Sequence, residues 1–145
     1  MLRAIRHYVG EIFRMGRLFY FRRMGVEMGQ HVFISWGAWI DVRSGQVKIG
    51  NRVTITNGCK ILSHDHARHL MKMPQTAITE IEDDVFIGMN SIILPGVLVG
   101  KGAIIGAGSI VARNVPSYSL VVGTAARVLK RFDAQNNTWI PVSED

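Results

Sequence analysis

The stretch IEDDVFIGMNSIILPGVLVGKGAIIGAGSIVA, residues 81–112, decides the fold, because an aliphatic residue recurs in it at every sixth position. The same step is found upstream, with interruptions after residues 40 and 61. A period of six fits neither an α-helix nor a plain alternating strand, so it predicts short strands that turn a corner at each repeat. The aliphatic series comprises Met28, Ile34, Ile40, Ile49, Ile55, Ile61, Ile81, Ile87, Ile93, Val99, Ile105 and Val111.

A second series lies four positions after each aliphatic residue and is small or β-branched. One large and one small inward residue per repeat predicts stacked coils around a continuous core, in which no single coil is stable alone. Cys59 belongs to this series and is therefore predicted to lie in the core. Glycines at the corners would relieve backbone with an unusual φ. The second series comprises Val32, Ala38, Ser44, Val53, Cys59, Val85, Ser91, Val97, Ala103, Ser109 and Val115, and Asp65 breaks it after Ile61.

Three repeats per coil place the coil starts at residues 28, 49, 81 and 99. Both interruptions then fall at the same corner, with three extra residues between Ile40 and Ile49 and fourteen between Ile61 and Ile81. Insertions on one face of a repeat protein usually form its binding face. The inserted loop 62–80 is therefore the first candidate for a functional segment.

Composition limits the remaining choices. A chain of 145 residues with 48% hydrophobic and 19% charged residues fits one folded domain. Its single cysteine excludes an intrachain disulfide and a cysteine-only metal site, and favours a reducing compartment. The sequence offers neither eighteen consecutive uncharged apolar residues nor a secretory signal. We therefore expect a cytoplasmic protein, at most in contact with the inner face of the membrane.

The net charge of +6 is concentrated near the N-terminus. Residues 1–25 are predicted to form a basic amphipathic helix, because they contain six arginines and one acidic residue, Glu11. Apolar residues recur in this segment at steps of three and four, namely Leu2, Ile5, Val9, Ile12, Phe13 and Phe19. Two interpretations stay open: packing against the domain or a neighbouring subunit, and binding to anionic lipid. Nucleic acid is disfavoured, because no stacking platform accompanies the arginines. The repeat domain follows over 26–123, and 124–145 is a C-terminal tail.

The run 49–130, especially IEDDVFIGMNSIILPGVLVGKGAIIGAGSIVARNVPSYSLVVGTAARVLKR, resembles the hexapeptide-repeat acyltransferases, and among them the galactoside, maltose and polysaccharide O-acetyltransferases. The closing RFDAQNNTWIPV resembles the lipopolysaccharide-type members. The resemblance implies an all-β solenoid, namely a left-handed parallel β-helix with an N-terminal helix and a short C-terminal segment. It also implies a homotrimer with sites between subunits, and acetyl-CoA as co-substrate without a metal.

Transfer of an acetyl group to a hydroxyl needs a base, which a neutral imidazole supplies at cytoplasmic pH. In the family, the catalytic histidine follows its repeat's aliphatic residue by five positions, which is His66 here. His64 is the alternative, because Ser63-His64-Asp65 resembles the Ser-His-Asp of some members. Asp65, Asp41 or Glu80 could orient the base, and the sequence does not choose among them.

The resemblance also implies residues that bind the donor. Met89 aligns with the residue whose backbone N–H meets the oxyanion, although many relatives have a small residue there. Arg113 and Lys130 are expected to bind the nucleotide phosphates. The expected contacts to CoA are Gly88, Met89, Ala107, Ala112, Arg113 and Lys130.

The acceptor site is predicted from the stretch ISWGAWIDVRSG, residues 34–45. Trp39 and Trp36 are candidate stacking platforms for a sugar ring, and Asp41 and Arg43 are candidate polar contacts. The function that follows is O-acetylation of a sugar in surface polysaccharide or lipopolysaccharide biosynthesis, by direct transfer. Two alternatives stay open: a zinc-dependent hydratase of the γ-carbonic-anhydrase type using histidines among His31, His64, His66 and His69, and a non-enzymatic scaffold.

Overall fold

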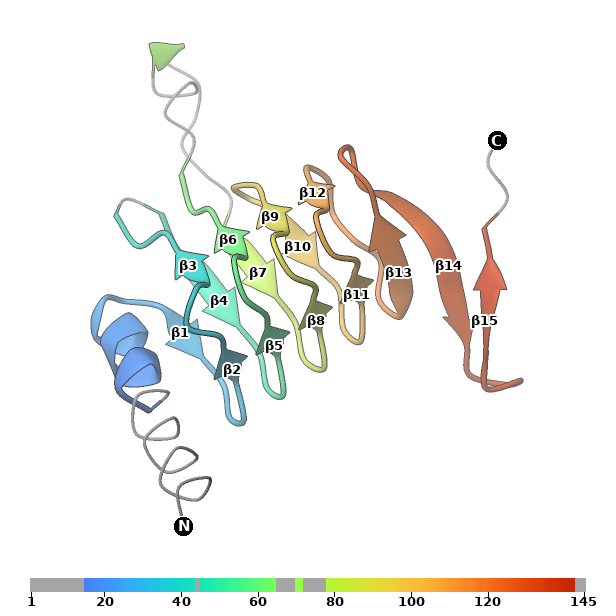
Figure 1. Cartoon of the computed structure of the whole chain (residues 1–145), viewed down its shortest axis with the longest axis horizontal. Coiled ribbons are helices and arrows are strands. Elements are labelled where there is room, and N and C mark those ends of the chain that lie inside the picture. Colours follow the sequence, from blue (N-terminus) through green and yellow to red (C-terminus); the bar gives the residue numbers. More distant parts are fainter. Residues whose placement is uncertain (1–14, 44, 65–69, 72–77, 143–145) are drawn as a thin grey trace.

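The computed structural model describes residues 15–43, 45–64, 70–71 and 78–142 (Figure 1). Short strands follow the predicted repeats almost one for one. Their bounds are β1 (Glu27–Met28), β2 (Phe33–Ile34), β3 (Trp39–Ile40), β4 (Val47–Ile49), β5 (Thr54–Ile55), β6 (Lys60–Ile61), β7 (Thr79–Ile81), β8 (Phe86–Ile87), β9 (Ile92–Ile93), β10 (Leu98–Val99), β11 (Ile104–Ile105) and β12 (Ile110–Val111).

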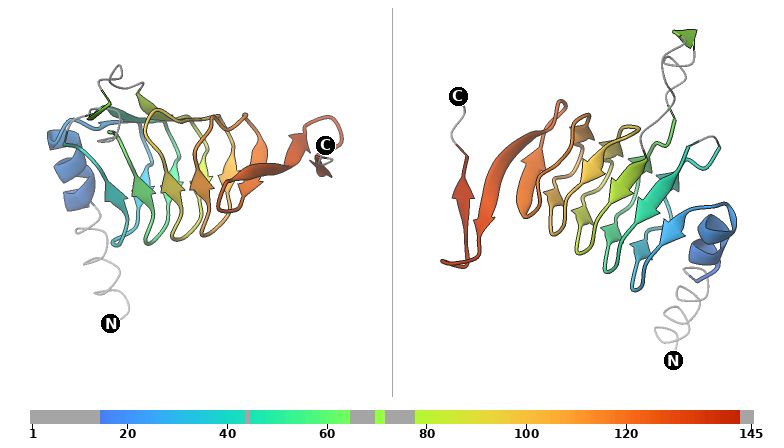
Figure 2. Two further views of the ribbon diagram at one scale, coloured as in Figure 1. Left: turned by 90° about the horizontal axis from the view of Figure 1, so that it is seen from above. Right: turned by 180° about the vertical axis from the view of Figure 1, so that it is seen from behind.

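These strands form three parallel sheets that the chain visits in turn. The first sheet holds β1, β4, β7 and β10, the second holds β2, β5, β8 and β11, and the third holds β3, β6, β9 and β12. We define a coil as one passage of the chain through the three sheets. Figures 1 and 2 show the coils side by side along the long axis of the molecule. The predicted rotation of short strands through three parallel sheets is thus confirmed.

The strand register confirms the predicted coil starts. Met28 pairs with Ile49, Ile49 with Ile81 and Ile81 with Val99, which are steps of 21, 32 and 18 residues. In the chain, the extra residues of the first two coils fall between β3 and β4 and between β6 and β7, which are both connections from the third sheet to the first. Both interruptions therefore lie at one corner, as the sequence predicts.

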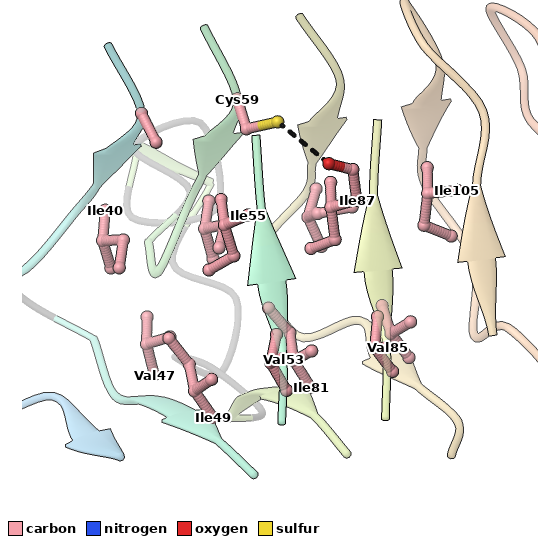
Figure 3. Packing of buried hydrophobic residues seen from close by; sticks show 14 of the residues in the cluster. Ile40, Val47, Ile49, Val53, Ile55, Cys59, Ile81, Val85, Ile87 and Ile105 are labelled. Carbon is pink, nitrogen blue, oxygen red and sulfur yellow. Dashed lines mark hydrogen bonds between the residues drawn. The ribbon is translucent and has the colours of Figure 1, made fainter. Parts of the chain in front are cut away.

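The core consists of the two predicted series of inward residues. Every member of the aliphatic series is buried except Met28, which is partly buried, and every described member of the small series is buried. Figure 3 shows Ile55, Ile87 and Ile105, which come from successive strands of the second sheet. Cys59 is fully buried, and its thiol lies 3.1 Å from the Gly88 carbonyl oxygen. Burying each such aliphatic side chain contributes about 2 kcal/mol, so repetition stabilises the stack.

Two features of the backbone allow the chain to turn at the corners: residues with a positive φ, and glycines where neighbouring coils come close together. At the corner between the first and second sheets, Arg52, Asp84 and Gly102 occupy equivalent positions in successive coils with φ of 54°, 61° and 66°. Gly88 is outside the left-handed region, but a Cβ there would lie 2.6 Å from the Ala107 nitrogen of the next coil. Glycine at this position therefore serves close approach of the backbones, rather than the unusual φ that the sequence suggested.

Residues 15–23 are helical and pack on the first coil (Figure 2). Phe21 is buried, and Leu18 packs against the core. Arg17 holds the helix in place, because its guanidinium donates to the carbonyl oxygens of Trp36 and Ala38. The remainder of the predicted helix, residues 1–14, lies outside the described residues. Among the described residues, no helix has the length and apolar character needed to cross a membrane.

The C-terminal region departs from the repeat. β13 (Ser119–Val122) still pairs in parallel with β11, but β14 (Arg127–Asp133) and β15 (Thr138–Pro141) continue the second sheet in antiparallel order. The sequence assigned no structure to the 124–145 tail, whereas β14 and β15 lie within it. Phe132 and Trp139 pack edge to face across the two strands, with centroids 5.4 Å apart.

Candidate functional site

The site forms at the corner where the third sheet returns to the first, because the chain there is released from the repeat. β3 and β6 pair through Ile40 and Ile61, and the Asp41 N–H donates to the Ile61 carbonyl at 2.8 Å. This bond extends the register one residue past the strands. Asp41 is therefore held beside the segment that leads from Ile61 to His64.

His64 and Asp41 form the central pair of the site. The His64 Nδ1 nitrogen hydrogen-bonds to Asp41 Oδ2. The backbone N–H and the Nε of Arg43 each lie 3.3 Å from Asp41 Oδ1. The Asp41 side chain is 2% exposed and that of His64 is 27% exposed. With Nδ1–H directed at the carboxylate, Nε2 is the ring atom left to accept a proton.

The environment of Asp41 favours its carboxylate form. Burial alone would raise its pKa, but the hydrogen bonds from the Arg43 backbone and from the His64 and Arg43 side chains outweigh that effect. The pKa of Asp41 is consequently lowered from its ordinary value. A carboxylate that stays ionised orients the imidazole and stabilises the charge that the ring gains when it accepts a proton.

A pocket of about 350 Å³ opens beside this pair. Trp39 projects from the outer face of β3 and forms one wall, and apolar side chains from the next coils form the other. The lining residues are Trp39, Asp41, Arg43, Leu62, His64, Leu94 and Pro95. The pocket thus combines an aromatic face, a cation and an oriented imidazole.

Two contacts fix the backbone that carries His64. Thr79 is fully buried, its Oγ1 donates to the Leu62 carbonyl at 2.8 Å, and the same oxygen accepts from the Gly96 N–H at 2.9 Å. On the other side, Gly45 lies so close that a Cβ on it would be 1.8 Å from the Ser63 carbonyl oxygen. The start of the inserted loop is therefore held between the preceding and following coils.

The predicted site residues divide between described and undescribed positions. His66, His69 and Asp65 lie outside the described residues. Of the other candidates for orienting the base, Asp41 contacts His64, whereas Glu80 lies on the exposed side of β7 and lines another pocket. Asp41, which the sequence offered also as an acceptor contact, is thus engaged with the imidazole.

The predicted donor contacts at the corner after β8 differ in availability. The Gly88 N–H donates to the Ile105 carbonyl at 2.8 Å and its carbonyl accepts from Ser91, so its polar groups are used within the coils. Met89 is half exposed and Ala107 is exposed. No described backbone carbonyl accepts a hydrogen bond from the Met89 or Ala107 N–H.

Two arginine side chains line one pocket near the end of the stack. A pocket of about 230 Å³ lies between the strand β12 and the crossing strand β14, and both Arg113 and Arg127 line it. Ala112 is exposed next to Arg113. Lys130 lies further along β14 and does not line this pocket. Arg113 therefore shares a pocket with Arg127 and not with Lys130.

Trp36 lies apart from the His64 pocket. The Arg17 guanidinium carbon lies 5.7 Å from the centroid of its ring, so this tryptophan contacts the N-terminal helix. Among the described residues, no group of three or more histidine, cysteine, aspartate or glutamate side chains is placed to hold a metal ion.

Sequence reasoning missed Leu94, Pro95 and Thr79. The six-residue repeat could have predicted that Leu62 and Leu94 lie side by side in the pocket wall, because they directly follow the paired residues Ile61 and Ile93. The role of Thr79 has no such signal, since it depends on where the inserted loop rejoins the stack.

Comparison with known proteins adds a family. Residues 78–113 match the family described as bacterial transferase hexapeptide (six repeats). A 2,3,4,5-tetrahydropyridine-2,6-dicarboxylate N-acetyltransferase of Staphylococcus aureus is 46% identical over 69 residues, which cover 48% of this chain and 29% of that protein. The match therefore spans less than a third of the curated relative.

Solved structures extend the likeness over more of the chain. A hexapeptide-repeat acetyltransferase from Vibrio cholerae, complexed with acetyl coenzyme A, is 31% identical with a TM-score of 0.64, over 75% of this chain and 61% of that one. The polySia-specific acetyltransferase NeuO is 28% identical with a TM-score of 0.64, over 83% of this chain and 56% of that one.

Proposed function

This chain belongs to the hexapeptide-repeat family, and we propose that it is an acetyl-CoA-dependent O-acetyltransferase acting on a carbohydrate hydroxyl. The family implies a left-handed parallel β-helix, which the rotation through three parallel sheets supports. The proposed setting is surface polysaccharide or lipopolysaccharide assembly in the cytoplasm. The similarity to a polySia-specific acetyltransferase supports an acceptor of that class.

The observation that carries this proposal is the His64–Asp41 pair at the pocket. The acceptor oxygen forms a bond to the acetyl carbonyl carbon while its proton passes to His64 Nε2. Asp41 holds the Nδ1–H and stabilises the protonated ring. The same nitrogen then returns the proton to the departing CoA sulfur, so the base is regenerated and no covalent enzyme intermediate is needed.

His66 is the alternative base. It has the family register, five residues after Ile61, whereas His64 has a carboxylate partner and a pocket. Either histidine can serve the same direct transfer. The mutations below separate the two.

The Met89 N–H is the proposed donor to the developing oxyanion. Met89 lies at the corner between the second and third sheets, whereas His64 lies at the corner between the third and the first. One chain therefore keeps these groups at different corners of its coils, and a site that uses both needs a second copy. This supports a homotrimer with each site between neighbouring subunits.

Acetyl-CoA supplies the activated acetyl group as co-substrate. Arg113 and Arg127 are suited to its phosphates, because two guanidinium groups line one pocket. The free N–H of Ala107 lies at the same corner as Met89 and suits the pantetheine amides. Ala112, Lys130 and the backbone of Gly88 complete the proposed contacts, of which Gly88 has the least support.

The acceptor is proposed to occupy the His64 pocket. Trp39 offers an aromatic face to a sugar ring, and Arg43 offers hydrogen-bond donors at the pocket edge. Trp36 contributes less in this proposal, because Arg17 lies against its ring.

An amine acceptor is the second candidate. It is favoured by the 46% identity to an N-acetyltransferase, although that match covers 29% of the relative. An amine that arrives protonated must also lose a proton before it attacks, so the imidazole would serve either substrate. The acceptor panel therefore includes amines.

The test measures CoA thiol release with Ellman's reagent, using the full chain and a panel of sugars, nucleotide-linked sugars and small amines. His64→Ala and His66→Ala are compared with wild type, and His31→Asn is the control, because His31 is an exposed histidine at another corner. Loss of the base should lower kcat about 10²–10⁴-fold. We expect that loss in His64→Ala and wild-type turnover in His31→Asn.

Three outcomes would change the proposal. Full turnover in His64→Ala with loss in His66→Ala transfers the role of base to His66. Release that depends only on amines replaces the carbohydrate acceptor. No acceptor-dependent release, together with no acetyl-CoA binding by calorimetry, overturns the enzyme function.

A further inference from the structure

The described part of the N-terminal helix has two unlike sides. Leu18 and Phe21 face the first coil, where Phe21 is 4% exposed. Met15 and Phe19 are 67% and 70% exposed. These two residues are four apart and therefore lie on one side of the helix, one turn from each other. The helix thus buries one apolar side on its own domain and presents another to solvent.

The outward side is held in a fixed orientation. Arg17 donates to two carbonyl oxygens of the corner between β2 and β3, at 2.6 Å for Ala38, and its guanidinium lies 5.5 Å from the Phe21 ring centroid. The Arg22 Nη2 donates to the Gly29 carbonyl at 2.8 Å. These anchors on both sides of Phe21 prevent the helix from rolling its exposed apolar residues onto the coils.

The same outward side carries uncompensated positive charge. Arg22 and Arg23 are exposed and follow Phe19 by three and four residues. No acidic side chain of the described residues pairs with either arginine, and the nearest acid in the chain, Glu27, lies 3.3 Å from Lys48. Upstream in the sequence, Ile5 and Ile12 precede Phe19 at steps of seven, with further arginines between them.

We propose that the helix side formed by Met15, Phe19, Arg22 and Arg23, named the basic apolar side, binds an anionic lipid surface. Exposed apolar residues flanked by arginines suit the boundary between lipid headgroups and acyl chains, where the apolar groups insert and the guanidinium groups meet phosphates. A single convex helix side offers no groove for a peptide. This binding does not depend on acetyl transfer.

The test is flotation of the full chain with vesicles of phosphatidylcholine alone and of phosphatidylcholine mixed with phosphatidylglycerol. We expect wild type to float with the mixed vesicles only, and added salt to weaken the binding. Arg23→Gln should lower the vesicle affinity about fivefold. Phe19→Glu should abolish flotation. Ile140→Glu is the matched control, since Ile140 is a half-exposed apolar residue on β15, at the opposite end of the molecule.

Each outcome decides the proposal. Flotation of Phe19→Glu equal to that of wild type, or no flotation of wild type with anionic vesicles, overturns it. A change in oligomer mass of Phe19→Glu by light scattering, with unchanged flotation, assigns the basic apolar side to a second copy instead. Phe19 is exposed, so the variant should keep the wild-type melting temperature and thiol release with a soluble acceptor.

Discussion

Asp84 and Asp41 each accept a hydrogen bond from a basic side chain one coil away, but at different corners of the stack. Asp84 receives the Arg52 Nε and Nη2 at 2.6 and 2.8 Å, and their side chains are 37% and 54% exposed. Asp41 receives His64, and its own side chain is 2% exposed at the floor of a pocket. The first pair is solvated, and the second is enclosed.

The difference follows from the corners themselves. Where the first sheet meets the second, successive coils repeat the same turn with an equivalent left-handed residue. A pair such as Arg52–Asp84 therefore lies on the surface of a regular stack of turns. Where the third sheet meets the first, the coils differ in length, so the regular repeat of turns is interrupted there. Burying a carboxylate is costly, and groups kept in such surroundings gather at functional sites. We therefore propose that the irregular corner carries the active site, whereas the regular corner serves the fold.

The largest expected effect separates the two carboxylates by activity. Asp41→Asn should lower kcat about 10²-fold or more, because an amide cannot enforce the Nδ1–H tautomer or stabilise a protonated ring. Asp84→Asn should leave kcat unchanged. Thiol release at saturating acetyl-CoA and acceptor measures both. An equal loss in the two variants would mean that the corners are coupled and that the comparison fails.

A smaller effect tests the packing that holds His64. Gly45→Ala would place a methyl group 1.8 Å from the Ser63 carbonyl oxygen, so the backbone beside His64 must move. We expect a loss of about 1–3 kcal/mol in the free energy of unfolding, as in overpacked sites, and a lower kcat. Urea unfolding followed by circular dichroism measures the former.

The control for that variant is Gly16→Ala in the helix. Nothing lies within 4 Å of a Cβ at Gly16, so alanine should stabilise the protein by about 0.5–1 kcal/mol through helix propensity. A Gly45→Ala protein as stable and active as wild type would show that the inserted loop does not depend on this contact.

The repeat made the fold predictable to single residues. The step of six identified Ile34, Ile55 and Ile87 as buried, and the same step placed the extra residues of two coils at one corner. Such precision arises because each coil repeats the packing problem of its neighbour. β14 and β15 lack the six-residue period and pair in antiparallel order, so the repeat does not predict these two strands.

The site was predictable only in part, because it lies where the period stops. The sequence named the loop, with His66 as the first candidate base and His64 as the alternative, but it did not choose among Asp41, Asp65 and Glu80 as the partner. The register does supply a criterion: the step of 21 that pairs Ile40 with Ile61 carries Asp41 to the segment entering the loop. Contacts of Arg17 with the corner near Trp36 depend on helix docking and have no periodic signal.

The smallest expected effect distinguishes the pairs by their response to pH and salt. The hydrogen bond from Arg52 holds the pKa of Asp84 below its ordinary value, and the hydrogen bonds to Asp41 outweigh burial and lower its pKa as well. A carboxyl with a lowered pKa in the folded state stabilises the protein above the unfolded pKa of about 3.9, and this stabilisation is lost as the pH falls through the folded pKa. Urea midpoints measured below pH 5 should therefore fall less steeply in Asp41→Asn and in Asp84→Asn than in wild type.

High salt should erase the difference for the solvated Asp84 and preserve it for the enclosed Asp41, because ions screen exposed charges far more than buried ones. Equal screening of both differences would show that Asp41 is as solvated as Asp84, and the distinction between the two corners would then fail.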